Sequence, residues 1–207
     1  DFKKDLGITM TEAGLAVGLQ MLMWGLTGPI FGAISDKYGG HKAIMLGFIF
    51  YIAGIYFLYI GPNTGLFFQL ELGVLIGIGL GATAISIPIS IVGKHFPLSN
   101  RTIAMSIVTA VGSFGFFLSP LFTNYSLKSH GWENTLYYFG VFLLIGLIIS
   151  FFVRSPSRSE SPEKKNSQTT NQALKEAFKT KSYIFLVLGF FVCGFHITLV
   201  GTHVPQY

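Results

Sequence analysis

The residues of this chain that could do chemistry are a few polar groups set within long apolar segments. Glu71 lies near one end of such a segment, where its carboxyl group could accept a proton or reach the headgroups of a bilayer. His196 lies in another apolar segment, and its imidazole could exchange a proton, hydrogen-bond a solute or simply pack. Ionisable groups are costly at membrane depth, so both are candidates for proton transfer or solute binding.

Other polar or amphipathic side chains in the apolar segments are candidates for solute contact. Gln20 and Trp24 are one helical turn apart and could face a cavity, with packing against lipid or the protein core as the alternative. Ser113 lies in a Gly-rich run, and Thr198 follows the candidate histidine. The predicted substrate or proton site therefore comprises Gln20, Trp24, Glu71, Ser113, His196 and Thr198.

The sequence gives no support for covalent catalysis, a metal site or a cofactor. It contains neither the Gly-x-Ser-x-Gly nor the His-Glu-x-x-His pattern, so an intramembrane enzyme is disfavoured. Cys193 is the only cysteine, which excludes a disulfide framework or a cysteine metal site within one chain. No Gly-x-x-x-x-Gly-Lys-Ser/Thr phosphate loop is present, which disfavours a pump driven by ATP.

The segments that carry these residues predict an all-α, polytopic membrane protein. Apolar residues make up 51% of the 207 residues and charged residues only 11%, a balance typical of membrane proteins. A helix needs about 20 mostly apolar residues to cross the hydrocarbon layer. Six segments meet this need: Glu12–Ile34, Ala43–Ile60, Phe67–Val92, Ile103–Phe122, Thr135–Val153 and Tyr183–Val204.

The third segment carries glycines at every fourth position, namely Gly73, Gly77 and Gly81. Such a stripe allows another helix backbone to approach closely. We interpret it as a packing surface, although it also suits helices that rock during alternating access.

The positions of the basic residues predict how the helices are oriented. Eleven of the 14 Lys and Arg residues fall in the connections on one face, and only Lys3, Lys4 and Lys128 fall on the other. Because basic residues are retained on the cytoplasmic side, the first face is predicted to be cytoplasmic. This face includes residues 154–181, a polar stretch rich in Ser, Glu, Lys and Asn that we interpret as a linker rather than a regulatory site.

The predicted cytoplasmic loop between the first two segments carries a distinctive pattern, formed by Gly32, Asp36, Lys37, Gly39 and Lys42. The first glycine allows close helix approach, and the second permits the backbone reversal that starts the next helix. The carboxylate could accept hydrogen bonds from the first N–H groups of an adjacent helix, or merely cap the next helix. In type, spacing and position this loop resembles the signature loop of the major facilitator superfamily.

The resemblance implies a fold and a role for the loop. It identifies the segments as helices two to seven of a twelve-helix transporter, with the first helix upstream of the sequence. Residues 1–153 would belong to the N-terminal half, 154–181 to the central linker and 182–207 to the start of the C-terminal half. Asp36 would help latch the two halves on the cytoplasmic side. Gly40 and His41 depart from the pattern, since many members have Arg there.

Residues Phe190 to Pro205, which cover most of the last segment, resemble the seventh helix of bacterial monocarboxylate and oxalate/formate porters. This implies a secondary active transporter of a small organic anion such as a monocarboxylate, working by alternating access. The coupling partner would be a proton or a counter-solute, and the protein would be a monomer in a bacterial inner or plasma membrane. Two alternatives remain, an efflux pump for amphipathic compounds and a non-transporting membrane sensor on the same fold.

Overall fold

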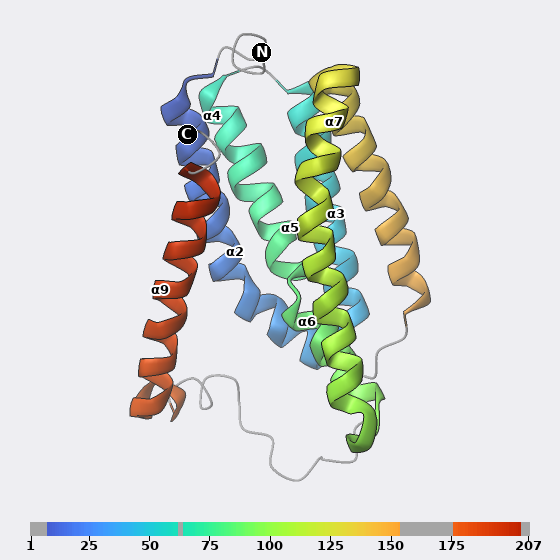
Figure 1. Ribbon diagram of the computed structural model, residues 1–207, viewed down its shortest axis with the longest axis vertical. Coiled ribbons are helices and arrows are strands. Elements are labelled where there is room, and N and C mark those ends of the chain that lie inside the picture. Colours follow the sequence, from blue (N-terminus) through green and yellow to red (C-terminus); the bar gives the residue numbers. More distant parts are fainter. Residues whose placement is uncertain (1–7, 62–63, 154–175, 204–207) are drawn as a thin grey trace. The chain divides into compact units, whose positions relative to one another are not determined.

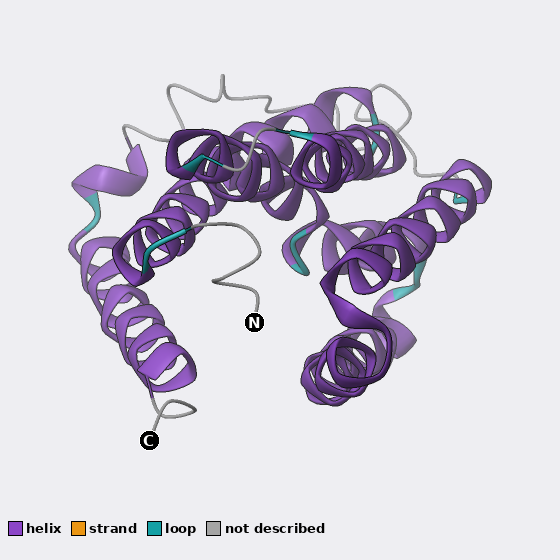
Figure 2. Ribbon diagram, turned by 90° about the horizontal axis from the view of Figure 1, so that it is seen from above, coloured by secondary structure: helices purple, strands orange, loops and turns teal. Residues whose placement is uncertain are grey.

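The computed structural model describes residues 8–61, 64–153 and 176–203. Within these residues it contains helices and short connections and no strand, which confirms the all-α prediction (Figures 1 and 2). The chain divides into two compact units, Asp1–Pro162 and Glu163–Tyr207, which are described separately. The elements are α2 (Met10–Tyr38), α3 (Gly40–Ile60), α4 (Gly65–Phe68), the π-helix η1 (Gln69–Leu75), α5 (Ile76–Thr83), α6 (Ser86–His95), α7 (Leu98–Phe152) and, in the second unit, α9 (Lys181–His203).

Helix α2 begins at a capping box. The Glu12 N–H donates to Thr9 Oγ1 at 3.3 Å, and the Thr9 N–H donates to Glu12 Oε2 at 2.8 Å. This reciprocal arrangement satisfies backbone donors that the first turn of a helix would leave unpaired. The helix therefore begins at Met10, two residues before the predicted start of the first span at Glu12.

Glycine contacts hold α5 between α2 and α3. A Cβ built on Gly77 would meet the Met23 side chain at 2.7 Å and the Gln20 carbonyl oxygen at 2.9 Å, both on α2. On the α3 side, a Cβ built on Gly79 would meet Tyr51 at 2.8 Å. The packing interpretation of the glycine stripe is confirmed, because only glycine lets these backbones come so close.

The third predicted segment is not one continuous α-helix. It contains the π-helical turns of η1, and its helical path ends at Ala84, where φ is −53° and ψ is 145°. Pro88 explains the break, because proline has no N–H to donate to the carbonyl four residues earlier and its ring clashes with that carbonyl. The Ala84 carbonyl instead accepts from the Ile87 N–H at 3.0 Å.

Helix α7 folds back on itself at Gly131, whose φ of 79° and ψ of 177° are not helical. Figure 1 shows its two arms running in opposite directions. Across the turn, the Ser126 and Thr135 hydroxyl groups share a hydrogen bond of 2.9 Å, and the Phe122 and Phe142 rings are 5.5 Å apart. The fourth and fifth predicted spans are these two arms. The helices extend further into the predicted connection than expected, because hydropathy reports apolar length rather than helix length.

Among the described residues, four helical stretches are long and apolar enough to cross a membrane: Thr11–Tyr38, Gly40–Ile60, Gly65–His95 and Leu98–Phe152. The last contains both arms of α7, and the sixth predicted span lies in α9, where the described apolar stretch is Lys181–His196. Large apolar side chains such as Leu22, Ile107 and Phe116 are exposed along these helices, as expected for surfaces that face lipid. Of the predicted linker, residues 154–175 lie outside the described part of the chain.

Candidate functional site

The signature loop forms the short connection between α2 and α3. Gly39 adopts a φ of 96°, a conformation that favours glycine, and its N–H donates to the Ser35 carbonyl at 3.0 Å. Next to it, Gly40 lies against Ile91 of α6 so closely that a Cβ would overlap the Ile91 side chain. The predicted backbone reversal at these two glycines is confirmed.

Asp36 is held by a side chain far away in the sequence. Lys94 Nζ, in the last turn of α6, donates to Asp36 Oδ1 at 2.9 Å. The N-cap residue of α3 is Gly39, which makes no side-chain cap of its own, so capping of this helix by Asp36 stays a prediction. The hydrogen bonds expected from N–H groups of an adjacent helix likewise stay a prediction.

The remaining loop residues make fewer contacts. Lys37 Nζ lies 5.1 Å from the Tyr38 ring centroid, and Lys42 is exposed in the first turn of α3. A Cβ built on Gly32 would meet no described atom within 4 Å, so its predicted close helix contact is not made within the described residues. His41 has a buried Nδ1 without a hydrogen-bond partner in the described part of the chain.

Within the first compact unit, the candidate residues at membrane depth do not form one cluster. Gln20 is half-buried, and its backbone packs against Gly77, while Trp24 is half-buried one turn further along α2. Glu71 is buried in η1 at the end of the bundle opposite the signature loop. His196 is exposed on α9, in the other compact unit, and the side chain of Thr198 lies outside the described residues.

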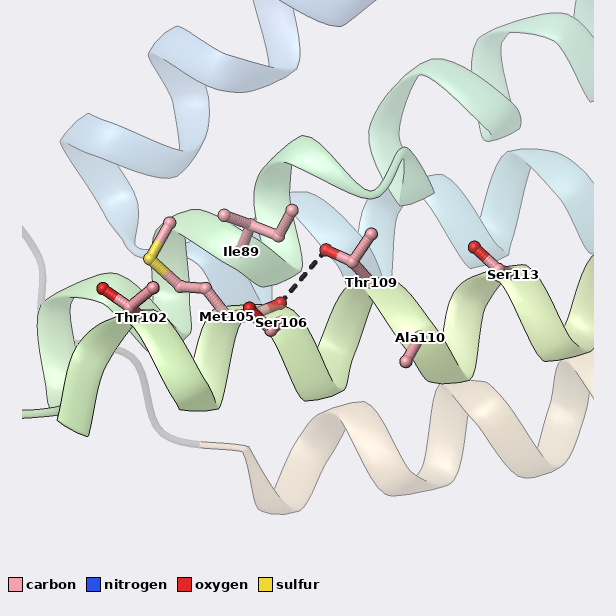
Figure 3. Close-up of a pocket in the computed structure, with 7 residues that line it drawn as sticks. All are labelled: Ile89, Thr102, Met105, Ser106, Thr109, Ala110 and Ser113. Carbon is pink, nitrogen blue, oxygen red and sulfur yellow. Dashed lines mark hydrogen bonds between the residues drawn. The ribbon is translucent and has the colours of Figure 1, made fainter.

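Ser113 is one of the residues that line a pocket. The pocket has a volume of about 560 Å³ and lies between α6 and the first arm of α7. Figure 3 shows it lined by Ile89 from α6 and a row of side chains from α7: Thr102, Met105, Ser106, Thr109, Ala110 and Ser113. Four of the seven lining residues carry hydroxyl groups.

The hydroxyl row follows the helical repeat. Thr102, Ser106, Thr109 and Ser113 are spaced by four, three and four residues, which places them on one face of α7. The Thr109 hydroxyl donates to the Met105 carbonyl at 3.1 Å, whereas the other three hydroxyl groups have no hydrogen-bond partner among the described residues. These three groups are free to donate to a bound solute.

A different face of the same helical arm is apolar and exposed, and it includes Ile103, Ile107 and Val111. Lipid can cover that apolar face without cost, but hydrocarbon offers no hydrogen-bond partner to a free hydroxyl group. The hydroxyl face therefore fits a water-filled cavity or another helix better than it fits lipid.

Sequence reasoning found Ser113 but missed Thr102, Ser106 and Thr109. The signal was present in the sequence, because the four hydroxyl residues share a helical face while the neighbouring face is apolar. It was overlooked because isolated Ser and Thr residues are common in membrane helices and commonly bond to their own backbone, as Thr109 does.

Comparison with known proteins finds relatives that carry transporter names. The chain is 28% identical over 162 residues to "Probable nitrate transporter NarT" of Staphylococcus aureus strain Newman, which covers 77% of this chain and 40% of that relative. A protein of the same name from Staphylococcus carnosus strain TM300 is 27% identical over 155 residues, covering 73% of this chain and 38% of the relative. The chain thus spans about 40% of the length of these relatives.

The family model described as Major Facilitator Superfamily matches residues 1–207, the whole of this sequence. Members of this family move small solutes across membranes, and both relatives carry transporter names. The multi-span helical fold, the loop between α2 and α3 and the family match lead to one conclusion: this chain belongs to the major facilitator superfamily.

Proposed function

We propose that the full-length protein is a secondary transporter of a small monovalent oxyanion. In this proposal the hydroxyl-lined pocket is where the N-terminal half contacts the solute. The observation that carries it is the row of Thr102, Ser106 and Ser113, whose hydroxyl groups lack partners among the described residues. Hydroxyl donors suit an anion whose oxygen atoms accept hydrogen bonds.

Two substrates of this class deserve direct comparison. The relatives named as nitrate transporters favour nitrate, and the resemblance of the last segment to monocarboxylate porters favours a monocarboxylate. Both are small planar anions with one negative charge and oxygen acceptors. Since a water molecule occupies about 30 Å³ in the liquid, a pocket of about 560 Å³ has room for either anion with several waters.

The sequence-based assignments complete the proposal. Residues 1–153 would supply helices two to six, 154–181 the cytoplasmic linker and 182–207 the start of the seventh helix. The solute would be exposed to each side in turn as the two halves rock. The protein would act as a monomer in the cell membrane, with a proton or counter-solute as the coupling partner.

The test is uptake by the full-length protein in proteoliposomes, with labelled nitrate, formate and acetate in separate arms and an amphipathic dye in a fourth. Saturable uptake of nitrate or of a carboxylate, competed by the other anion, is expected. Movement of the dye alone would indicate the efflux-pump alternative. Anion binding in detergent without movement in vesicles would indicate the sensor alternative, and either result would overturn the proposal.

A further inference from the structure

Glu71 is the only Asp, Glu, Lys or Arg side chain that is buried in the described part of the chain, with 6% of its surface exposed. It lies in the first turn of the π-helix η1, and its backbone carbonyl accepts a hydrogen bond from the Ile76 N–H. Turns of this kind occur often at functional sites. Burial of a carboxyl group inside a membrane helix is costly, so its presence there calls for a role.

The Glu71 carboxyl group lies against the end of α3. A Cβ built on Gly61, the residue that follows α3, would overlap Glu71 Oε1, and it would also come within 2.6 Å of the Phe57 carbonyl oxygen. Two acceptor oxygens are therefore close together on one side of Gly61. The final carbonyl groups of a helix also carry the negative end of its dipole, which disfavours a second negative charge.

The ionisable groups of the elements packed against η1 do not neutralise this carboxyl group. Helix α2 presents Glu12 at the same end of the bundle, α3 contributes the tyrosines Tyr51, Tyr56 and Tyr59, and α4 and α5 have no ionisable residue. The cationic residues of α2 and α3 are Lys37, His41 and Lys42, which lie at the other end of both helices. Among the described residues, Glu71 forms no ion pair.

A bound proton would stabilise these neighbouring acceptor oxygens better than a metal ion would. A carboxylic acid can donate its proton to a nearby carbonyl oxygen, so one proton both removes the charge and joins two acceptors. A metal ion would need several oxygen ligands. The described residues contain no group of three or more His, Cys, Asp or Glu side chains that could hold one.

We propose that Glu71 is the proton-binding residue that couples solute movement to a proton gradient, with the end of α3 as its hydrogen-bond partner. This inference rests on the proposed function. On binding, the carboxylate takes one proton and becomes a neutral acid, and on release it returns that proton to the other side of the membrane. One proton carried with one monovalent anion moves no net charge, so accumulation should follow the pH gradient and not the membrane potential.

The experiment compares wild type, Glu71→Gln and Glu12→Gln in the full-length protein reconstituted in proteoliposomes. With the outside more acidic by one pH unit, the wild type should accumulate the anion about tenfold if one proton moves with each anion. Glu71→Gln should abolish this accumulation, while counterflow, which is driven by a gradient of unlabelled solute and needs no proton gradient, falls much less. Glu12→Gln is the matched control, because it removes a carboxylate at the same end of the bundle, and it should accumulate solute as wild type does.

The outcomes separate the two proposals. Accumulation by Glu71→Gln equal to that of wild type would overturn the inference and leave the proposed function standing. Accumulation driven by a sodium gradient instead of a pH gradient would also overturn it. The absence of both uptake and counterflow in wild type would instead overturn the proposed function.

If Glu71→Gln does not reach the membrane, two variants that keep a carboxyl group replace it. Gly61→Ala fills the space that the Glu71 carboxyl group occupies beside α3, and Glu71→Asp shortens its reach. Both should lower accumulation more than counterflow, and Glu71→Asp should retain a response to the pH gradient. If both variants keep the same ratio of accumulation to counterflow as the wild type, the inference is overturned.

Discussion

Lys94 Nζ lies 2.9 Å from Asp36 Oδ1, although 58 residues separate the two in the sequence. The ion pair joins the signature loop to the last turn of α6, the helix that contributes Ile89 to the hydroxyl-lined pocket. The lysine is also placed favourably for the negative end of the α6 dipole. The pair therefore links one wall of the pocket to the loop between α2 and α3.

Removing this ion pair should cost little stability. The Asp36 side chain is 60% exposed and that of Lys94 is 33% exposed, so solvent weakens their attraction. A double-mutant cycle with Asp36→Asn and Lys94→Met, followed by chemical unfolding in detergent, should give a coupling energy of about 0.2–1 kcal/mol. Lys37→Met is the control, because Lys37 lies over Tyr38 rather than beside Asp36. A coupling energy of several kcal/mol would show that the pair is a main source of stability.

The free hydroxyl groups of the pocket should contribute to solute affinity. Ser106→Ala and Ser113→Ala should each raise the KM for the transported anion, since each removes a hydrogen bond worth about 0.5–1.5 kcal/mol, or about two- to tenfold in KM. Thr109→Val is the control within the same pocket, because the Thr109 hydroxyl already donates to the Met105 carbonyl. An equal rise in KM for all three variants would contradict a role for the free hydroxyl groups.

The close contact of Gly77 with α2 should make it intolerant of a side chain. Gly77→Ala would place a Cβ within 2.7 Å of Met23 and 2.9 Å of the Gln20 carbonyl oxygen. We expect a loss of about 1–3 kcal/mol in the free energy of unfolding. Gly115→Ala is the matched control, because a Cβ there meets no atom within 4 Å, and it should be neutral or stabilising. Thermal unfolding in detergent, followed by circular dichroism, measures both.

The turn inside α7 should depend on Gly131. Its φ of 79° and ψ of 177° are strained for any residue with a Cβ. Gly131→Ala should destabilise the protein by about 1–3 kcal/mol, although no neighbouring atom blocks the added methyl group. Gly140→Ala, in a helical part of the second arm that is also open, should have no such cost. Equal unfolding midpoints for the two variants would contradict a strain at Gly131.

The places of the apolar helices could be predicted from the sequence because lipid imposes a simple rule, about 20 apolar residues for each crossing. The break at Ala84 was predictable in principle from Pro88, but a proline inside a membrane helix is often tolerated, so the residue alone does not decide between a kink and an interruption. Likewise, Gly39 marked the turn of the signature loop, and its positive φ bears this out.

The sequence by itself determined the membrane class, the helical fold, the signature loop and most single candidate residues, because these follow from local composition and spacing. Only the tertiary structure decided which residues meet: Asp36 with Lys94, Ile89 with the hydroxyl face of α7, and Glu71 with Gly61. Each of these contacts joins different helices. Helices in lipid associate through close fit rather than through burial of apolar surface, and hydropathy carries no record of that fit.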